Sequence, residues 1–484
     1  MTRPKPKRGR PILNVQANRA IEFIEQNREL LIGLSDRVWE YAELALHEAK
    51  SAQCLAEALS DFGFDVQMGV AGMPTAFVAT WGKARPVIGL LGEYDALAGV
   101  SQAASARRHE VIPGGPGHGC GHNLLGVGSL AAAVALKKEL EERQLDATIK
   151  FFGCPAEENF SGKAFMARDG LFETCDACLT WHPGSHNAVR ANSSLAVTAM
   201  NIRFAGRTAH AAADPYNGRS ALDAVQIMNM GVEFLREHVP PSARVHYVIT
   251  NGGLQPNVVP ASASVWYMIR SPERHEVDAL YQRVIECAEG AAQMTATTFD
   301  VEMVEAIANI LRNPTLEKLL QQCLEAVGPP RFSAEHVAFA REIRQSFPDS
   351  RKDETDPRPT AQQVLHQEVL AGRLTQEQPR GSTDVGDVSW CSPTSQFSTA
   401  CTAIGTPGHS WQYTAQAGMG IGHEGMLCAA KVLAEAALQL ITTPAVLEAA
   451  RDEFSHLTGG KRYESSMPPG MKPAFHLFEK PSSR

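Results

Sequence analysis

The residues best suited to chemistry stand close together at positions 117–123, which read GHGCGHN. This stretch places the thiol of Cys120 and the imidazoles of His118 and His122 among glycines, which allow the backbone to turn tightly. Thiolates and imidazoles are ligands that zinc and similar divalent metals favour. The alternative is a glycine-rich turn with an incidental buried cysteine, and a Cys-x-His pair alone does not decide between the two.

Four other stretches share one design, a short apolar run that is followed by acidic residues or a histidine. The polar residues at these four ends are Glu93 with Asp95, Glu157 with Glu158, His182, and His409. Short apolar runs between helices predict buried strands of an α/β sheet, and ligand sites of such sheets gather beyond the carboxyl ends of the strands. Solvated glutamates or core histidines would explain any single end. All four ends together, with Cys120 and His122, indicate a metal site.

The elements that would position these residues follow from the same patterns. Residues 124–140 are rich in Ala, Leu and Val, and they predict a buried helix with Asn123 near its N-cap. The apolar run before His409 predicts a strand at 399–405, and residues 425–441 predict the final helix. We therefore expect a catalytic α/β domain with a mixed or mostly parallel sheet.

Residues 196–304 predict a separate domain that is inserted into the catalytic one. Strand and helix patterns follow one another there in the order β-α-β-β-α-β, which is that of a ferredoxin-like sandwich. The catalytic domain is then discontinuous and comprises residues 1–195 and 305–484. The predicted fold class is α/β with an inserted ferredoxin-like α+β domain.

Composition argues against several other classes of protein. The chain has 484 residues, enough for two domains, and its net charge of -8 argues against nucleic-acid binding, which needs a basic surface. The basic residues 1–10 lack an apolar core and are not a secretory signal, and no apolar run predicts a membrane span. The ten scattered cysteines suit reduced thiols and predict a cytoplasmic protein, with the CxxC pair Cys175 and Cys178 interpreted as structural.

The motifs resemble those of the aminoacylase-like dinuclear metallopeptidases, the family that includes carboxypeptidase G and the plant auxin-conjugate hydrolases. The motifs that carry this resemblance are GEYDAL at 92–97, GHGCGHN at 117–123, GCPAEE at 153–158, TWHP at 180–183, AHAA at 209–212, GRSALDA at 218–224, PNVV at 256–259, STDVGDVSW at 382–390 and GTPGHSWQ at 405–412. Together they are highly specific. The resemblance implies a catalytic α/β domain, an inserted lid used for dimerisation, and amide hydrolysis at two divalent metal ions.

Adjacent carboxylates suit metal-assisted hydrolysis, because one can bind metal while the other takes a proton from water. The resemblance implies that Glu157 is the general base, that Glu158 is a ligand, and that Asp95 orients a ligand or the base. The ligands that it implies for two Mn2+ or Zn2+ ions are Cys120, His122, Glu158, His182 and His409.

Three further residues lie in or near these motifs. His423 competes with His409 for the last ligand position, and His409 is favoured because it follows the predicted strand end. His118 is assigned a supporting role. Glu93 stands where many relatives have a ligand histidine, which puts direct ligation through this strand in doubt.

In the inserted domain, His210 resembles the histidine that reaches a partner subunit's active site and stabilises the tetrahedral oxyanion. Asn257 and Arg270 match positions near the substrate's carboxylate, for which an arginine fork is well suited. A strand-end surface charge is the alternative for Arg270. The resemblance therefore implies a homodimer through the inserted domain, or assembly with a second, related subunit.

The expected activity is hydrolysis of the amide bond of N-acyl or N-aroyl amino acids. An aroyl-glutamate such as p-aminobenzoyl-glutamate is the leading substrate, and another conjugate such as indole-acetyl-aspartate is the runner-up. A non-catalytic metal-binding or ligand-binding protein on the same fold is an alternative from a different class, but such a protein has no need of a general base. An aminopeptidase with the same metals is a third possibility.

Overall fold

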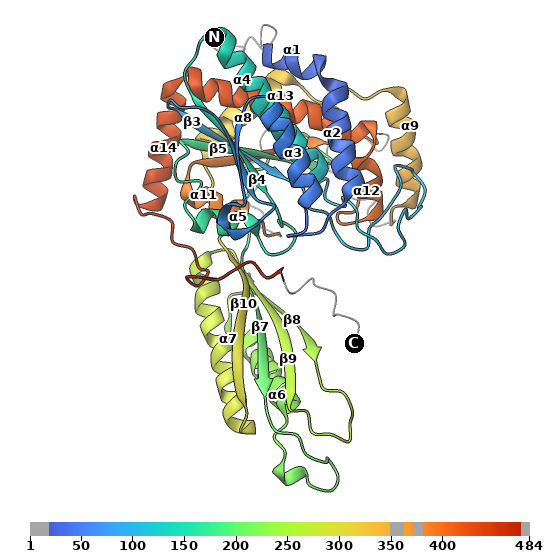
Figure 1. The fold of residues 1–484 in the computed structure, drawn as a ribbon, viewed down its shortest axis with the longest axis vertical. Helices are drawn as coiled ribbons and strands as arrows, with labels where there is room; N and C mark the ends of the chain where they lie inside the picture. Colours follow the sequence, from blue (N-terminus) through green and yellow to red (C-terminus); the bar gives the residue numbers. More distant parts are fainter. Residues whose placement is uncertain (1–18, 349–362, 371–380, 476–484) are drawn as a thin grey trace, which may run out of the picture.

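The computed structural model describes residues 19–348, 363–370 and 381–475, so the predicted basic tail at 1–10 lies outside the described residues. It consists of two parts, each built around one β-sheet (Figure 1). The smaller, elongated part projects away from the larger one, and the segment that follows α14 (Pro444–Thr458) passes along the junction between them.

The larger part is organised around a seven-stranded sheet with the order β1-β2-β4-β3-β5-β11-β6. Its strands are β1 (Asp65–Met68), β2 (Phe77–Gly82), β3 (Val87–Glu93), β4 (Thr148–Cys154), β5 (Ala177–Gly184), β6 (Ala188–Val189) and β11 (Thr394–Ala400). The four central strands β4, β3, β5 and β11 run parallel, and the strands toward both edges pair antiparallel. The carboxyl ends of the central strands therefore meet at one edge, as predicted.

Helices cover both faces of this sheet. They are α1 (Arg19–Gln26), α2 (Arg28–Tyr41), α3 (Ala49–Asp61), α4 (His122–Arg143), α5 (Gly162–Arg168), α8 (Pro314–Val327), α9 (Ala334–Ile343), α11 (Val385–Cys391), α12 (Trp411–Ala417), α13 (Gly420–Thr442) and α14 (Pro444–Thr458). Alternate strand residues point to opposite faces. Leu90 packs in the core that holds α4 and α13, whereas its neighbour Leu91 packs in the core that holds α5 and α11.

The smaller part is a four-stranded antiparallel sheet with the order β10-β7-β9-β8. Its strands are β7 (Ala196–Ala205), β8 (Arg244–Asn251), β9 (Ser262–Ser271) and β10 (Thr298–Ile307), and its helices are α6 (Ala221–Leu235) and α7 (Arg274–Thr295). The predicted order β-α-β-β-α-β is confirmed, although β10 continues past the predicted boundary at 304. We call this part the four-stranded unit. Short 3-10 turns complete the described chain at Val70–Gly72, Pro215–Asn217, Arg236–His238 and Arg344–Ser346.

The central helix α4 begins earlier than the sequence predicts. His122 is its first residue, and the N-cap is Gly121, whose φ of 78° places it in the left-handed region that suits glycine. Asn123 is therefore not a cap. It is buried inside the first turn, where its amide donates to Ser35 Oγ and to the carbonyl of Ala417, each at 3.0 Å.

The prediction of a strand at 399–405 was wrong, because the strand is β11 at Thr394–Ala400. Its sequence TSQFSTA is too polar to be recognised as buried, yet all seven residues are buried. Hydrogen bonds make this burial possible: Thr399 Oγ1 donates to the carbonyl of Gly425 at 2.9 Å, and Thr394 Oγ1 donates to that of Ser392 at 2.8 Å. His409 consequently lies in a loop well beyond the strand.

The final helices also differ from the prediction. Helix α13 starts at Gly420 rather than at 425, and α14, which was not predicted, follows it. Among the described helices, α13 is long and apolar enough to pass a length and composition test for a membrane span. However, 78% of its apolar window is buried in the protein, where it packs against α4 and α8, as expected of a core helix.

Candidate metal centre

The carboxyl edge of the seven-stranded sheet brings the predicted polar residues together. In the register of the sheet, Glu93 at the end of β3 lies beside Cys154 at the end of β4. The loop that follows β4 carries Glu157 and Glu158, and the ring of His182 projects from β5. The N-terminal part of α4 packs closely against this edge of the sheet. The helix and Glu93 are so close that a Cβ atom on Gly126 would lie only 2.6 Å from the carbonyl oxygen of Glu93.

His122 is the centre of the arrangement and is fully buried. Its Nδ1 lies 2.8 Å from Asp95 Oδ1, and this hydrogen bond fixes the ring so that Nε2 faces three other carboxylates. Nε2 lies 3.3 Å from Glu93 Oε2, 4.0 Å from Glu157 Oε2 and 3.9 Å from Glu158 Oε1. An imidazole nitrogen surrounded by carboxylate oxygens has the geometry of a metal-binding corner.

Potential ligand atoms within 4.8 Å of one another form three groups among the described residues. The groups are Cys120, His122 and His182; Cys120, Glu158 and His409; and Glu93, His122 and Glu157. Cys120 Sγ lies 3.4 Å from His182 Nε2, and His409 Nε2 lies 3.3 Å from Glu158 Oε2. Cys120 and His122 each belong to two of these groups, so the three groups form one continuous set of potential ligands.

The chemistry of this donor set fits divalent cations. The buried atoms His122 Nε2, Glu158 Oε1 and Glu93 Oε2 have no hydrogen-bond partner among the described residues, although they point toward one another. Burial, together with the charges of Glu93 and Glu158, raises the pKa of Glu157 well above its usual value. Burial and the charge of Glu158 also raise the pKa of Cys120 to about 12. Cations would offset this crowding of negative charge and would use the unpartnered atoms.

Two residues of this region, Lys163 and Asp384, were not identified from the sequence as part of the site. Lys163 lies on α5 and is fully buried, with Nζ 2.7 Å from Glu93 Oε1 and 2.6 Å from Asp384 Oδ1. Asp384 also accepts from the backbone N–H of Lys163 at 2.8 Å. A lysine in an apolar helix next to paired glutamates is a sequence signal that could have revealed this ion triad. The triad holds one oxygen of Glu93 and leaves the other facing His122.

The sequence and fold of this chain match those of known hydrolases. The sequence profile described as Peptidase family M20/M25/M40 matches residues 89–471. The chain belongs to this peptidase family. It is 42% identical to one subunit of the p-aminobenzoyl-glutamate hydrolase of Escherichia coli K12, over 94% of this chain and 98% of that protein. It is 31% identical to the Xaa-Arg dipeptidase of Mus musculus, over 91% and 93% of the two chains.

Solved structures show the same architecture. The fold resembles the crystal structure of a putative aminohydrolase from methicillin-resistant Staphylococcus aureus, with a TM-score of 0.63 and 16% identity. That likeness covers 87% of this chain and 99% of the other. The chain is thus a hydrolase of the M20 family with the two-sheet fold.

Two histidines that the sequence singled out lie outside the three ligand groups of this M20 hydrolase. His118 Nε2 lies 3.0 Å from the carbonyl of Val38, and burial lowers the pKa of His118 to about 4. His423 lies on α13, and its Nε2 is 2.9 Å from Asp36 Oδ1 of α2. Of the two candidates for the last ligand position, only His409 is near Cys120 and Glu158 in the described structure.

The predicted residues of the four-stranded unit lie at its two opposite ends. His210 forms a bridge with Val258, and the N–H of Ala211 donates to the carbonyl of Asn257 at 3.1 Å. Loops 206–220 and 252–261, which we call the tip, lie at the end of the unit away from the seven-stranded sheet (Figure 1). Arg270 lies at the other end of the ten-residue strand β9, a span of about 30 Å.

Within one chain, therefore, His210 and Asn257 are not brought to the metal centre. Arg270 lies on the near side. Its charge acts on the partly buried Glu305, which accepts a hydrogen bond from Ser161 Oγ at 2.7 Å. Ser161 follows the Glu157–Glu158 loop closely. The guanidinium of Arg270 itself contacts Met268 Sδ at 2.8 Å.

A second cation near the centre, Arg190, was also missed. Its Nε donates to Ser398 Oγ at 2.8 Å, and Ser398 is the register partner of His182 in the sheet. Burial and the charge of Arg190 both lower the pKa of His182. The exposed Arg190 therefore places a positive charge beside a predicted ligand.

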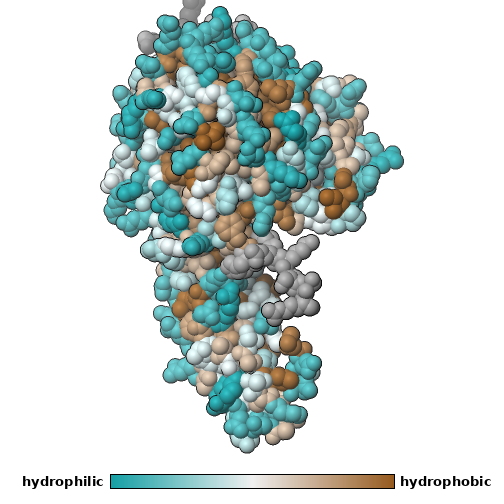
Figure 2. All heavy atoms as spheres, in the orientation of Figure 1, coloured by the Kyte–Doolittle hydropathy of each residue, from teal (hydrophilic) through white to brown (hydrophobic). Residues whose placement is uncertain are grey.

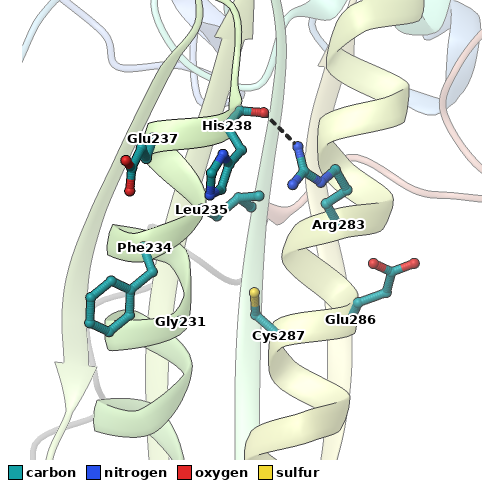
Figure 3. A pocket seen from close by; sticks show the side chains of 8 residues that line it. All are labelled: Gly231, Phe234, Leu235, Glu237, His238, Arg283, Glu286 and Cys287. Atoms are coloured by element: carbon teal, nitrogen blue, oxygen red, sulfur yellow. Dashed lines mark hydrogen bonds between the residues drawn. The ribbon is translucent and has the colours of Figure 1, made fainter.

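A hollow on the surface of the four-stranded unit lies between α6 and α7 (Figure 3). Phe234 and Leu235 line one side and Cys287 the other, while Arg283 Nη1 donates to the carbonyl of His238 at 2.8 Å. None of the predicted site residues is among the eight residues that line it. The hollow is separate from the metal centre.

Proposed function

We propose that this M20 hydrolase cleaves the amide bond of N-acyl or N-aroyl amino acids at two divalent metal ions. The leading substrate is p-aminobenzoyl-glutamate, which would give p-aminobenzoate and glutamate. The observation that carries the proposal is the pair of ligand groups that share Cys120 and lie beside Glu157. The 42% identity to the E. coli hydrolase subunit over nearly its whole length supports the choice of substrate.

The proposed ligands of the two ions, Mn2+ or Zn2+, are Cys120, His122, Glu158, His182 and His409. When bound, such ions polarise the substrate carbonyl and lower the pKa of water. Glu157 is the proposed general base, which accepts a proton from the attacking water and passes it to the leaving amide nitrogen. Asp95 holds the ring of His122 in the orientation that directs Nε2 into the site.

The proposed partner is a second copy of the chain, which would bind through the four-stranded unit. Strand β8 is an edge strand, and its residues Tyr247, Val248 and Ile249 expose apolar side chains. Hydrophobic residues gather on the margin of this unit where β8 lies (Figure 2). A partner so placed would let the tip, with His210 and Asn257, serve the site of the other chain. A related, non-identical subunit is the alternative, because the E. coli relative is named as one subunit of its hydrolase.

We further propose domain bounds of 1–195 with 305–484 for the catalytic part and 196–304 for the inserted part, and a cytoplasmic location. All ten cysteines are free thiols, which suits a reducing compartment. Substrate would bind between the two parts, with Arg270 near its carboxylate.

The similarity to the mouse Xaa-Arg dipeptidase supports a second candidate activity, hydrolysis of dipeptides. A dipeptidase must recognise a free α-amine, whereas an amidohydrolase of conjugates accepts a blocked nitrogen. A non-catalytic ligand-binding role is less well supported, because Glu157 is retained within 4.0 Å of His122 Nε2.

The test is a screen of the protein reconstituted with zinc, manganese or cobalt. The substrates are N-acyl and N-aroyl conjugates of Glu, Asp, Gly and Ala, with Xaa-Arg dipeptides alongside. The proposal predicts turnover of aroyl-glutamate in preference to dipeptides. Turnover of dipeptides alone would favour the second candidate, and no turnover with any metal would contradict both.

A further inference from the structure

A buried glutamate outside the metal centre is in contact with the loop that carries the proposed base. Glu48 directly precedes α3, is fully buried, and does not cap that helix with its side chain. Its Oε1 accepts from the backbone N–H of Leu46 at 3.0 Å and from that of Ala156 at 2.9 Å. Its Oε2 accepts from Thr75 Oγ1 at 3.1 Å. The Glu48 carboxyl thus joins three separate segments of the chain.

The contact with Ala156 matters because the backbone there is strained. Ala156 has a φ of 61°, and Phe160 and Ser161 in the same loop also have positive φ values, of 76° and 57°. Residues with side chains rarely adopt this region, so surrounding contacts must hold them there. Within the loop, the N–H of Ser161 donates to the carbonyl of Ala156 at 2.9 Å. The N–H of Ala156 donates to the Glu48 carboxyl, which lies outside the loop.

Glu157 lies between two such anchors. On its far side, the N–H of Glu158 donates to Asp95 Oδ2 at 2.9 Å, and Asp95 also orients His122. On its near side, Ala156 is held by Glu48 alone among the described side chains. The hydrogen bond to Asp95 fixes the backbone at the proposed ligand Glu158. The hydrogen bond from Ala156 to Glu48 therefore determines the direction in which Glu157 points.

We propose that Glu48 is a positioning residue that aims the carboxylate of Glu157 by holding the N–H of Ala156 in a left-handed backbone conformation. This inference rests on the proposed role of Glu157 as the general base. Glu48 itself touches no predicted ligand side chain in the described contacts, so it acts through the loop.

The role requires an acceptor oxygen rather than a charge. Burial, with the charge of Asp95 added, raises the pKa of Glu48 to about 8, which favours the neutral acid at pH 7. A glutamine would therefore reproduce the arrangement: its carbonyl oxygen accepts from Leu46 and Ala156, and its amide donates to Thr75 Oγ1. An alanine would leave two buried N–H groups without an acceptor.

The experiment compares Glu48→Ala with Glu48→Gln in the metal-reconstituted full chain, using the conjugate that the wild type turns over best. The matched control is Glu139→Ala. Glu139 is also buried and accepts a backbone N–H, that of Ala20 at 3.0 Å, but it lies on α4 at the contact with α1. The readouts are kcat, KM, bound metal by elemental analysis, and the thermal midpoint of unfolding.

For Glu48→Ala we expect kcat to fall by about 10–100-fold with KM little changed, since small misplacement of a catalytic group costs rate on this order. Two metal ions should remain bound, because Asp95 still holds Glu158. Glu48→Gln should recover most of kcat. Glu139→Ala should lower the thermal midpoint with little effect on kcat.

The proposal is overturned if folded Glu48→Ala has wild-type kcat, if Glu48→Gln is as impaired as Glu48→Ala, or if Glu139→Ala loses as much kcat. Loss of metal from Glu48→Ala would also overturn it, because Glu48 would then assemble the ligands instead of aiming the base. If Glu48→Ala does not fold, Glu48→Asp takes its place, since it keeps the carboxyl but is too short to reach Ala156. An inactive wild type would contradict the proposed function itself, a result distinct from all of these.

Discussion

Glu157 and Glu158, neighbours in the candidate metal centre, have different surroundings, which suits the two different roles that we propose for them. The side chain of Glu158 is 5% exposed and is close to both His122 and His409, whereas that of Glu157 is 13% exposed and is close to His122 and Glu93. Sequence alone predicted that these glutamates divide two roles, because their order along the chain was visible. It could not predict Lys163 or Glu48, whose roles depend on which distant carboxylate or N–H the fold brings to them.

The choice between His409 and His423 can be tested at the residue scale. We expect His409→Ala to reduce the bound metal below two ions per chain and to abolish most activity, because Nε2 lies 3.3 Å from Glu158 Oε2. His423→Ala should keep both ions, since its ring contacts Asp36. Elemental analysis of the two purified variants is the measurement. Metal loss from His423→Ala with full occupancy in His409→Ala would reverse the assignment.

The buried ion triad gives a second residue-scale prediction. Lys163→Met would leave Glu93 and Asp384 buried without their cation, so we expect the free energy of unfolding to fall by about 3–5 kcal/mol. Lys138→Met is the control, because Lys138 forms an exposed pair with Glu141 that contributes only about 0–1 kcal/mol. Urea denaturation of the two variants and the wild type measures these changes in the free energy of unfolding. Equal, small effects would show that the triad does not stabilise the fold.

At the scale of elements, hydrophobic patterns in the sequence predicted the apolar strands of the sheet. They did not predict the elements whose positions depend on polar side chains or on a glycine. The apolar runs near Glu93, Glu157 and His182 were predicted to be buried strands, and they form the parallel strands β3, β4 and β5. Strand β11 was misplaced because its polar sequence conceals its burial, and the tertiary hydrogen bond from Thr399 Oγ1 to the carbonyl of Gly425 is not visible in the sequence. The start of α4 was misplaced because a left-handed glycine, rather than a polar side chain, precedes it.

The length of strand β9 decides which residues of the four-stranded unit can share a site within one chain. Arg270 and Asn257 were predicted to act together, but strand β9 separates them. Both can still act on one substrate if the tip of a partner chain supplies His210 and Asn257. The active site would then be complete only in the dimer.

Mixing two inactive variants tests this arrangement. His210→Ala and Glu157→Ala should each be inactive alone. When they are mixed and allowed to exchange subunits, half of the dimers are mixed and each has one intact site, which predicts about a quarter of wild-type activity. Activity assays after unfolding and refolding the mixture provide the measurement. No recovery, despite dimers detected by light scattering, would show that the tip does not act in trans.

The whole molecule combines a large α/β part with a projecting four-stranded unit (Figure 1). The candidate metal ligands belong to the larger part. The centre crowds Glu93, Asp95, Glu157, Glu158 and Cys120 around one histidine. Such crowding opposes folding unless cations bind, so metal should stabilise the entire larger part.

Removal of metal should therefore lower the thermal stability of the chain. At metal concentrations about 1,000-fold above the dissociation constant, binding contributes about 4 kcal/mol to the free energy of unfolding. We expect dialysis against a chelator to lower the unfolding temperature, and zinc or manganese to restore it. Calorimetry before and after the metal is added back measures this change. An unfolding temperature that is unchanged by both the chelator and the added metal would be inconsistent with a bound metal centre.

The role of Glu157 as general base is tested by comparing Glu157→Ala with the wild type, both reconstituted with metal. We expect the variant to bind two ions per chain, as the wild type does, and its rate of hydrolysis of aroyl-amino acids to fall by about 100-fold or more. This result would separate ligation from proton transfer. Hydrolysis by metal-loaded Glu157→Ala at the wild-type rate would show that Glu157 is not the general base.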